Sequence, residues 1–338
     1  MEVWRGPVVE SRHRGHVAVV DGGGRLVASL GQPDTVTYLR SSAKPFQAVP
    51  LVTSGAADRF GLTESELAVA CGSHSGEDLH AETVARLLEK IGLEEGLLKC
   101  GVHDPYDRAT AERLRARGES PGVLRNNCSG KHTGMLALSR HLGSSPEAYD
   151  DPAGPVQRSI LRAVSQFSGR AAGGIALGTD GCGVPVFGLP VRAMALMYAR
   201  LVAPPEEFDA ETRAASRRLA AAMTVYPELV GGTVERFDTE VMRACRGLVV
   251  SKIGAEGVYT AGVRPCERWP KGLGLAFKIE DGEDRRARST IAIEALRQLG
   301  VLDEDAQKSL SPYANFPVLN HRGEKVGQIR ASFELERL

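Results

Sequence analysis

Strand-like segments at both ends of the chain, separated by a long helical stretch, constrain the fold more than any other feature of the sequence. Residues 16–30, HVAVVDGGGRLVASL, contain two β-rich runs around a glycine turn, which predicts a hairpin. Strand-like runs return after residue 245 and end in a second hairpin around Asn320–Gly323. Most of the chain between them has helical periodicity. The pattern therefore predicts an α/β (α+β) fold with an antiparallel-rich sheet built from both termini, flanked by helices, and a mostly helical middle region.

This pattern also predicts one catalytic unit made of two subdomains. Residues 1–60 and 245–338 should form the α/β sheet subdomain, and residues 61–244 the mostly helical one. A chain of 338 residues with 42% hydrophobic residues has enough apolar surface for a core of this size. We expect the site in the cleft between the subdomains, the usual place for a ligand pocket.

The charge balance and the cysteines limit the class of protein. Lysine and arginine number 42, as do aspartate and glutamate, so no net charge attracts nucleic acid or an anionic membrane. We expect a small neutral or zwitterionic partner. The absence of an apolar signal segment and of any run of about 18 apolar residues favours a cytoplasmic location. Six irregularly spaced cysteines predict mostly buried free thiols.

The stretch LRSSAKPFQAVP, residues 39–50, places Ser41 and Lys44 one helical turn apart at the start of a predicted helix. A desolvated lysine with a lowered pKa can take the proton of a serine hydroxyl and make it a nucleophile. On its own, however, the pattern is more typical of a helix-capping serine followed by a surface lysine.

Two further motifs change that balance. SHS at 73–75 lies in a glycine-flanked loop, and KIG at 252–254 follows an apolar run. Serine β-lactamases and penicillin-binding proteins use S-x-x-K, S-D-N and K-T-G in the same order. There the second serine relays protons, and the strand-end lysine stabilises substrate carboxylate and oxyanion. A loop serine and an ordinary strand-end lysine are the alternative, but the three motifs together favour catalysis by Ser41, Lys44, Ser73 and Lys252.

Two glycine-rich loops each carry a cysteine. They are NNCSGKH at 126–132 and DGCGVP at 180–185. Cys128 and Cys182 could form a tetrahedral zinc site with a nitrogen donor, although their spacing matches no standard zinc motif. Two buried free cysteines explain the pattern equally well. Cys128 as an independent nucleophile is a weaker alternative, because no histidine and carboxylate pair is assigned to it.

Three charged loop residues could hold the charges of a substrate. Asp180 and Glu256 could receive an ammonium group, and Arg40 could bind a carboxylate through two parallel hydrogen bonds. Each is more often a surface charge or a loop cap, so its significance depends on the neighbouring motifs.

Together these motifs resemble the asparaginase II family of the Rhizobium etli type, also called class 3 L-asparaginases. The matching segments cover nearly the whole chain: LRSSAKPFQA, SGAADRFGL, SHSGE, NNCSGKHTGMLAL, DGCGVP, SKIGAEGV and PVLNHRGEKVGQIR. The resemblance implies a fold similar to serine β-lactamases and glutaminases, a homodimer, and hydrolysis of L-asparagine to L-aspartate and ammonia.

The resemblance also implies roles for individual residues. Ser41 with Lys44, and Ser73 with Lys252, would form two serine–lysine tandems. Zinc without a direct catalytic part would be held by Cys128, Lys131 and Cys182. Lysine is an unusual zinc ligand, because its amine must be neutral to donate. The expected substrate-binding residues are Arg40, His74, Asp180 and Glu256.

The predicted reaction is amide hydrolysis through an acyl-enzyme. Neutral Lys44 would take the proton of Ser41 as the hydroxyl attacks the side-chain amide of asparagine. The sequence leaves open which of Ser41 and Ser73 attacks, and whether asparagine or glutamine, one methylene longer, is preferred. The same motifs permit a β-lactamase or DD-peptidase. A zinc-stabilised amino-acid-binding protein without catalysis is the non-enzymatic alternative.

Overall fold

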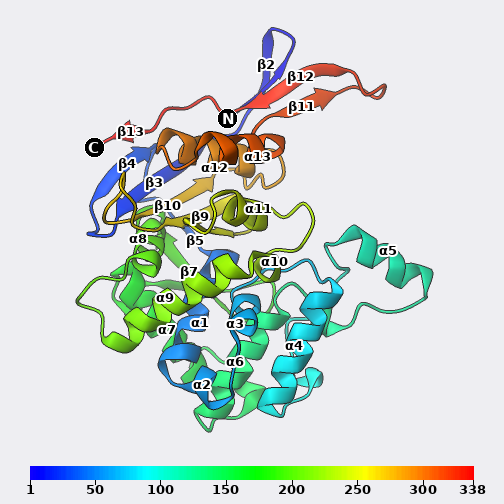
Figure 1. Ribbon diagram of the computed structural model, residues 1–338, viewed down its shortest axis with the longest axis vertical. Helices are drawn as coiled ribbons and strands as arrows, with labels where there is room; N and C mark the ends of the chain where they lie inside the picture. Colours follow the sequence, from blue (N-terminus) through cyan, green and yellow to red (C-terminus); the bar gives the residue numbers. More distant parts are fainter. The chain divides into compact units, whose positions relative to one another are not determined.

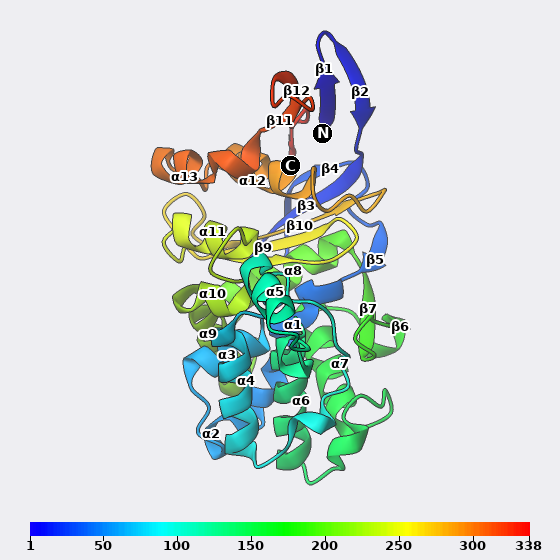
Figure 2. The same ribbon diagram turned by 90° about the vertical axis from the view of Figure 1, so that its right-hand side faces the viewer.

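The computed structural model describes residues 1–338, which divide into two compact units (Figures 1 and 2). Unit 1 comprises residues 1–42, 189–203 and 240–338, and unit 2 comprises residues 43–188 and 204–239. The antiparallel sheets and the flanking helices confirm the predicted α/β class.

Unit 1 contains two antiparallel sheets to which both ends of the chain contribute. The six-stranded sheet has the order β13 (Glu336–Arg337), β4 (Leu26–Leu30), β3 (Gly15–Asp21), β10 (Leu273–Ile279), β9 (Val258–Val263) and β8 (Val249–Ile253). The four-stranded sheet has the order β11 (Phe316–Leu319), β12 (Lys325–Arg330), β1 (Glu2–Arg5) and β2 (Val8–Arg12). The hairpins β3–β4 and β11–β12 confirm both predicted hairpins.

Helices cover both faces of the six-stranded sheet. In Figure 1, α8 (Val191–Val202) lies on one side and α12 (Arg288–Gln298) on the other. Strands β9 and β10 are therefore almost wholly buried, which explains why they read as continuous apolar runs rather than as alternating ones. Helix α8 lies so close to β10 that a Cβ at Gly274 would be 1.7 Å from the carbonyl oxygen of Ala195. Only glycine permits this approach.

The remaining elements of unit 1 are short or peripheral. They are β5 (Val36–Tyr38), the first residues of the 3-10 helix η1 (Arg40–Ala43), and α13 (Glu304–Ala314). Helix α11 (Phe237–Ala244) continues from unit 2 into unit 1.

Unit 2 is mostly helical. Its α-helices are α1 (Lys44–Thr53), α2 (Ala56–Arg59), α3 (Glu64–Ala70), α4 (Asp78–Ile91), α5 (Arg108–Ala116), α6 (Ser129–His141), α7 (Pro155–Ser168), α9 (Ala210–Val225) and α10 (Pro227–Val230). Its 3-10 helices are η2 (Glu95–Leu97), η3 (Val123–Arg125), η4 (Pro146–Ala148) and η5 (Ala172–Gly174), and strands β6 (Ala176–Thr179) and β7 (Pro185–Pro190) form a hairpin. Helix α1 packs against α6, α7 and α9, so nearly all its side chains are buried.

The observed units differ from the expected subdomains in three places: residues 43–60, 189–203 and 240–244. Helix α1, expected with the sheet, belongs to unit 2, and α8, expected with the helical region, belongs to unit 1. An apolar helix face shows that a helix is packed, but not against which partner. All six cysteines are free thiols and five are buried, as expected. None of the helices combines the length and the apolar character needed to cross a membrane.

Candidate active site

The predicted site residues form two sets, because the chain passes from unit 1 to unit 2 between Ser42 and Ala43, inside the LRSSAK motif. Unit 1 contains Arg40, Ser41, Lys252 and Glu256. Unit 2 contains Lys44, Ser73, His74, Cys128, Lys131, Asp180 and Cys182.

Ser41 lies in the 3-10 helix η1 and does not cap α1. The N-cap residue of α1 is Ala43, which makes no side-chain cap hydrogen bond. Instead, the Ser42 hydroxyl fixes this turn by donating to the Leu39 carbonyl at 2.5 Å. The helix-capping alternative for Ser41 is therefore wrong. Its half-buried hydroxyl follows Arg40, whose φ of 51° lies in the left-handed region that residues other than glycine rarely adopt.

Lys44 is a buried amine, 1% exposed, so the surface-lysine alternative is wrong. Its Nζ donates to the carbonyls of Gly72 at 2.7 Å and Asn127 at 3.1 Å. It also lies 2.9 Å from the Ser73 hydroxyl oxygen. Burial lowers the pKa of Lys44, against the opposing effect of the nearby Cys128. A neutral amine that gives its two protons to the carbonyls has a lone pair left for the Ser73 hydroxyl.

Backbone hydrogen bonds hold the loop that carries Ser73. The Ser73 amide donates to the Val230 carbonyl at 2.8 Å, and the Arg236 guanidinium donates to the Ser73 carbonyl. Two residues on, the Ser75 hydroxyl donates to the Gly231 carbonyl at 3.0 Å. The Ser73 side chain, which is 4% exposed, is thereby fixed beside Lys44 rather than open to water.

Both ring nitrogens of His74 are engaged inside unit 2. Nδ1 accepts from the Gly76 amide at 3.3 Å, so Nε2 carries the proton and donates to the Ser129 hydroxyl at 3.0 Å. The ring stacks on His80 with centroids 4.6 Å apart. Burial, followed by the neighbouring His80, lowers the pKa of His74 well below its usual value. His74 is thus a neutral, buried link between the Ser73 loop and the start of α6.

Cys128, Lys131 and Cys182 lie close together. Lys131 Nζ donates to Cys182 Sγ at 2.9 Å. A hydrogen bond from Cys182 lowers the pKa of Cys128 well below its usual value, and the same bond raises the pKa of Cys182. Burial lowers the pKa of Lys131, but Cys128, Cys182 and the more distant Asp180 outweigh it and raise the pKa overall. The Asn126 side chain fixes the loop by accepting from the Cys128 amide at 2.8 Å.

The two thiols of this donor set suit a zinc ion, whereas the Lys131 amine, whose pKa is raised, would have to lose its proton before it could bind the metal. One thiol already favours the thiolate that zinc binds, and a second thiol lies beside it. The structure has no group of three or more histidine, cysteine, aspartate or glutamate side chains that could hold a metal ion. The third protein ligand at this point would therefore have to be the Lys131 amine.

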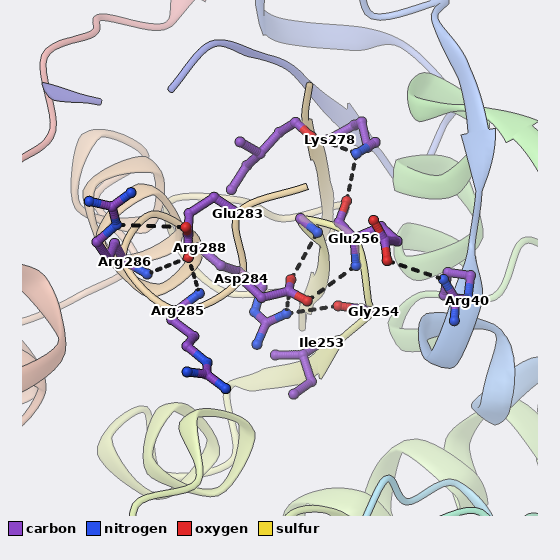
Figure 3. A network of polar contacts seen from close by, with 12 residues as sticks. Arg40, Ile253, Gly254, Glu256, Lys278, Glu283, Asp284, Arg285, Arg286 and Arg288 are labelled. Atoms are coloured by element: carbon purple, nitrogen blue, oxygen red, sulfur yellow. Dashed lines mark hydrogen bonds and ion pairs between the residues drawn. The ribbon is translucent and has the colours of Figure 1, made fainter. Parts of the chain in front are cut away.

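In unit 1, Lys252 is part of strand β8 rather than following it. It pairs in register with Thr260 of β9, whose hydroxyl donates to the Lys252 carbonyl at 3.0 Å. The side chain is fully buried, and its Nζ donates to the carbonyl of Ile253 at 3.1 Å. Glu256 lies in the following turn, with its Oε1 4.0 Å from Arg40 Nη1 (Figure 3). The two charges expected to bind substrate therefore face each other within one unit.

Sequence reasoning did not identify several residues that hold these groups. Asn126 and Asn127 belong to the quoted NNCSGKH loop, but a motif does not show that a backbone carbonyl binds Lys44. Arg236, which holds the Ser73 carbonyl, is a single arginine 163 residues further along the chain and has no local signal. Asp284 and Arg288, which hold the Glu256 turn, occur in an ordinary charged run, DGEDRRAR.

Comparison of the sequence with models of protein families identifies the class of protein. The family model described as L-asparaginase II matches residues 1–331. The protein is therefore a hydrolase that acts on amide C–N bonds. It belongs to the L-asparaginase II family.

Solved structures with low sequence identity also match. The chain is similar to Mglu in its native form, with 15% identity over 90% of this chain and 69% of that chain, and a TM-score of 0.44. For native Mglu in 4.3 M NaCl the identity is 14% over 88% of this chain and 62% of that chain, again with a TM-score of 0.44. A covalent complex of the Bacillus subtilis glutaminase YbgJ with 5-oxo-L-norleucine matches with 12% identity over 89% of this chain and 93% of that chain, at a TM-score of 0.40. This chain thus spans 62% to 69% of these two Mglu chains. No curated protein matches it.

Proposed function

We propose that this protein hydrolyses L-asparagine to L-aspartate and ammonia. The observation that carries the proposal is the environment of Lys44, a buried amine bound by two carbonyls and 2.9 Å from the hydroxyl of Ser73, the proposed proton relay. Removal from water favours its neutral form, which can act as a base toward serine. Membership of the L-asparaginase II family supports an amino-acid amide as the substrate.

In the proposed reaction, Ser41 is the nucleophile and Lys44 is the base. Lys44 takes the hydroxyl proton as Ser41 Oγ bonds to the side-chain amide carbon, and a β-aspartyl ester forms as the C–N bond breaks. Lys44 gives up this proton through Ser73 and Lys252 to the nitrogen, which leaves as ammonia, and Lys44 is neutral again. Water then gives a proton to Lys44 while its oxygen attacks the ester, and Ser41 recovers its proton.

The exposure of the two serines supports this division of roles. Ser41 is half-buried, so it has room to approach a substrate carbon, whereas Ser73 is 4% exposed and hydrogen-bonded to Lys44. A buried hydroxyl in contact with the base is suited to relay a proton. Backbone amides at the turn into α1 would stabilise the oxyanion.

Asparagine carries its α-carboxylate and α-ammonium on one carbon, and the proposed clamp supplies a group of opposite charge for each. Arg40 binds the carboxylate, and Glu256 and Asp180 receive the ammonium. The approach of Arg40 to Glu256 supports this assignment, because opposite charges 4.0 Å apart can hold the two charges of a zwitterion. We assign His74 to the support of the Ser73 loop, although it was expected to bind substrate, since both its nitrogens are engaged.

We also propose a zinc ion held by Cys128, Lys131 and Cys182, and a homodimer, as the resemblance implies. When bound, zinc would supply a fixed positive charge and cross-link the loop before α6 to the loop between β6 and β7. It would not contact the reacting amide.

Ammonia release separates this function from its alternatives. Purified protein is incubated with L-asparagine, L-glutamine, a β-lactam and a D-alanyl-D-alanine peptide, and the products are quantified. We expect ammonia from asparagine, less from glutamine, and no turnover of the other two compounds. Hydrolysis of the β-lactam or the peptide alone would assign a β-lactamase or DD-peptidase. Binding of asparagine without ammonia release would assign a binding protein.

A further inference from the structure

The turn that follows Lys252 is a constrained loop. Residues 254–257 connect β8 to β9, and the Gly254 amide closes the turn by donating to the Val258 carbonyl at 2.9 Å. Glu256, with a φ of 60°, occupies the left-handed region. A side chain is strained in this conformation, which persists only where the surroundings impose it.

Asp284, in the turn before α12, and Arg288, the first residue of α12, impose it (Figure 3). The Asp284 carboxylate accepts from the Gly257 amide at 2.8 Å and from the Glu256 amide at 3.2 Å. Arg288 donates to the Gly254 carbonyl at 2.8 Å and also to Asp284. One ion pair therefore holds both ends of the turn.

The backbone of Glu256 is fixed on its other side as well. Lys278 Nζ donates to the Glu256 carbonyl at 2.6 Å. Charged side chains therefore hold both the backbone carbonyl and the backbone amide of Glu256, the amide through Asp284. In contrast, the Glu256 side chain is 70% exposed. These hydrogen bonds thus fix the backbone of Glu256, while its carboxylate stays exposed.

The same turn is fitted to the segment that carries Arg40. A Cβ at Gly254 would lie 2.9 Å from the Leu39 carbonyl oxygen, so the two backbones are in contact. Arg40 follows Leu39 in a second left-handed conformation, and its guanidinium points toward Glu256 (Figure 3). Two strained non-glycine residues therefore face each other: Arg40 directly precedes Ser41, and Glu256 follows Lys252 by four residues.

We propose that Asp284 and Arg288 are positioning residues for substrate recognition. They hold the Glu256 carboxylate opposite Arg40, where it receives the α-ammonium of an amino-acid amide while Arg40 takes the α-carboxylate. The proposal rests on the function proposed above and assigns a part to two residues that never contact the substrate. If the network only stabilised the fold, its loss would not distinguish a ligand with an ammonium group from one without.

The same loop provides a matched control. Glu283 Oε1 accepts from the Arg285 amide at 2.7 Å and the Arg286 amide at 3.1 Å, but no hydrogen bond joins it to residues 254–257. Glu283→Gln removes a loop carboxylate with the same charge change as Asp284→Asn. The side-chain amide introduced by Asp284→Asn could accept from one backbone amide but would direct its own N–H groups toward the second amide or toward Arg288.

The test compares two probes, L-aspartate and succinate, which is aspartate without its ammonium group. Calorimetry measures the Kd of each for the wild-type protein, Asp284→Asn and Glu283→Gln, and ammonia release gives kcat and KM for asparagine. We expect Asp284→Asn to raise the Kd for aspartate about tenfold and the Kd for succinate less than twofold. The KM for asparagine should rise by a similar factor with kcat within about twofold, and Glu283→Gln should change none of these values.

Arg288→Lys is measured in parallel in case Asp284→Asn does not fold, as judged by circular dichroism. It keeps the charge but cannot bind Gly254 and Asp284 in the same planar geometry, so a selective loss of aspartate affinity is again expected. Equal weakening of aspartate and succinate, or no weakening in folded variants of an active wild type, would overturn the proposal. A wild type that neither binds aspartate nor releases ammonia would overturn the proposed function, and the inference with it.

Discussion

The residues around Lys44 and those around Glu256 show two different ways of holding a charged side chain. Lys44 is 1% exposed and bound by neutral carbonyls and a hydroxyl, whereas the Glu256 side chain is 70% exposed and directed by charged groups that hold its backbone. The first arrangement changes the chemistry of a group by removing water, and the second fixes only its position. Damage to the first should therefore reduce kcat, and damage to the second should raise KM.

The largest effect is expected for Lys44→Ala. Without the base, ammonia release from asparagine should fall by about 10³-fold in kcat, with little change in KM. The matched control is Lys90→Ala, since Lys90 also donates to a carbonyl, that of Gly61 at 2.9 Å, but is 33% exposed. If Lys44→Ala kept a kcat near that of Lys90→Ala, the buried amine would not take part in the chemical step.

The next largest effect is expected for Arg40→Ala. Loss of the carboxylate clamp should raise the KM for asparagine about 100-fold and leave kcat within a few-fold. β-Alaninamide, which is asparagine without its α-carboxylate, should be a poor substrate of the wild type and no poorer for the variant. If the variant lost activity equally on both substrates, Arg40 would have a general structural role rather than a role in recognition.

A third prediction concerns the proposed zinc site beside the buried region. Protein purified without added metal should contain about one zinc per chain, and Cys128→Ser or Cys182→Ser should reduce this to near zero by elemental analysis. Cys245→Ser is the control, because that thiol is also buried, and burial raises its pKa to about 12, away from any cluster. If wild-type protein without metal were fully active, Cys128 and Cys182 would serve only in packing.

The smallest effect is a pH dependence of stability from the histidine pair behind Ser73. Burial lowers the pKa of both His74 and His80 from the ordinary value of 6.5, so both rings are neutral in the folded protein. Unfolding takes up protons below that value, so stability is complete above pH 6.5 and is lost as the pH falls. The loss should be about 1.4 kcal/mol per pH unit for each histidine, down to its folded pKa.

Urea unfolding between pH 7.5 and pH 5 measures this slope, and His80→Gln should reduce it. His321→Gln, in the exposed turn between β11 and β12, should leave the slope unchanged. A stability that stays constant down to pH 5 would contradict the assignment of two neutral buried rings.

Local signals in the sequence were sufficient for much of the fold. The hairpin within residues 16–30 and the hairpin around Asn320–Gly323 form as predicted, because each depends on residues within a few positions of one another. The pairing of β1 with β12 joins the two ends of the chain and was not predicted, since no local pattern encodes a partner more than 300 residues away.

The site was predictable as a set of residues but not as an arrangement. Motif order indicated Ser41, Lys44, Ser73 and Lys252. The two expected serine–lysine tandems remain predictions, and the contact that the structure shows is between Lys44 Nζ and the Ser73 hydroxyl. Sequence spacing cannot show that Lys44 is buried, because the same S-x-x-K pattern also suits a surface turn. Asp284 escaped prediction because its ligands are backbone amides, which leave no mark in the sequence.

Covalent trapping shows which serine attacks the substrate, and so whether Ser41 reacts with Lys44 as its base. The protein is treated with a diazoketone analogue of asparagine, digested, and mapped by mass spectrometry, with Ser41→Ala and Ser73→Ala in parallel. We expect one adduct on the peptide carrying Ser41, absent in Ser41→Ala and retained, though formed more slowly, in Ser73→Ala. An adduct on Ser73 in the wild type, or undiminished ammonia release by Ser41→Ala, would contradict the assignment of Ser41 as the nucleophile.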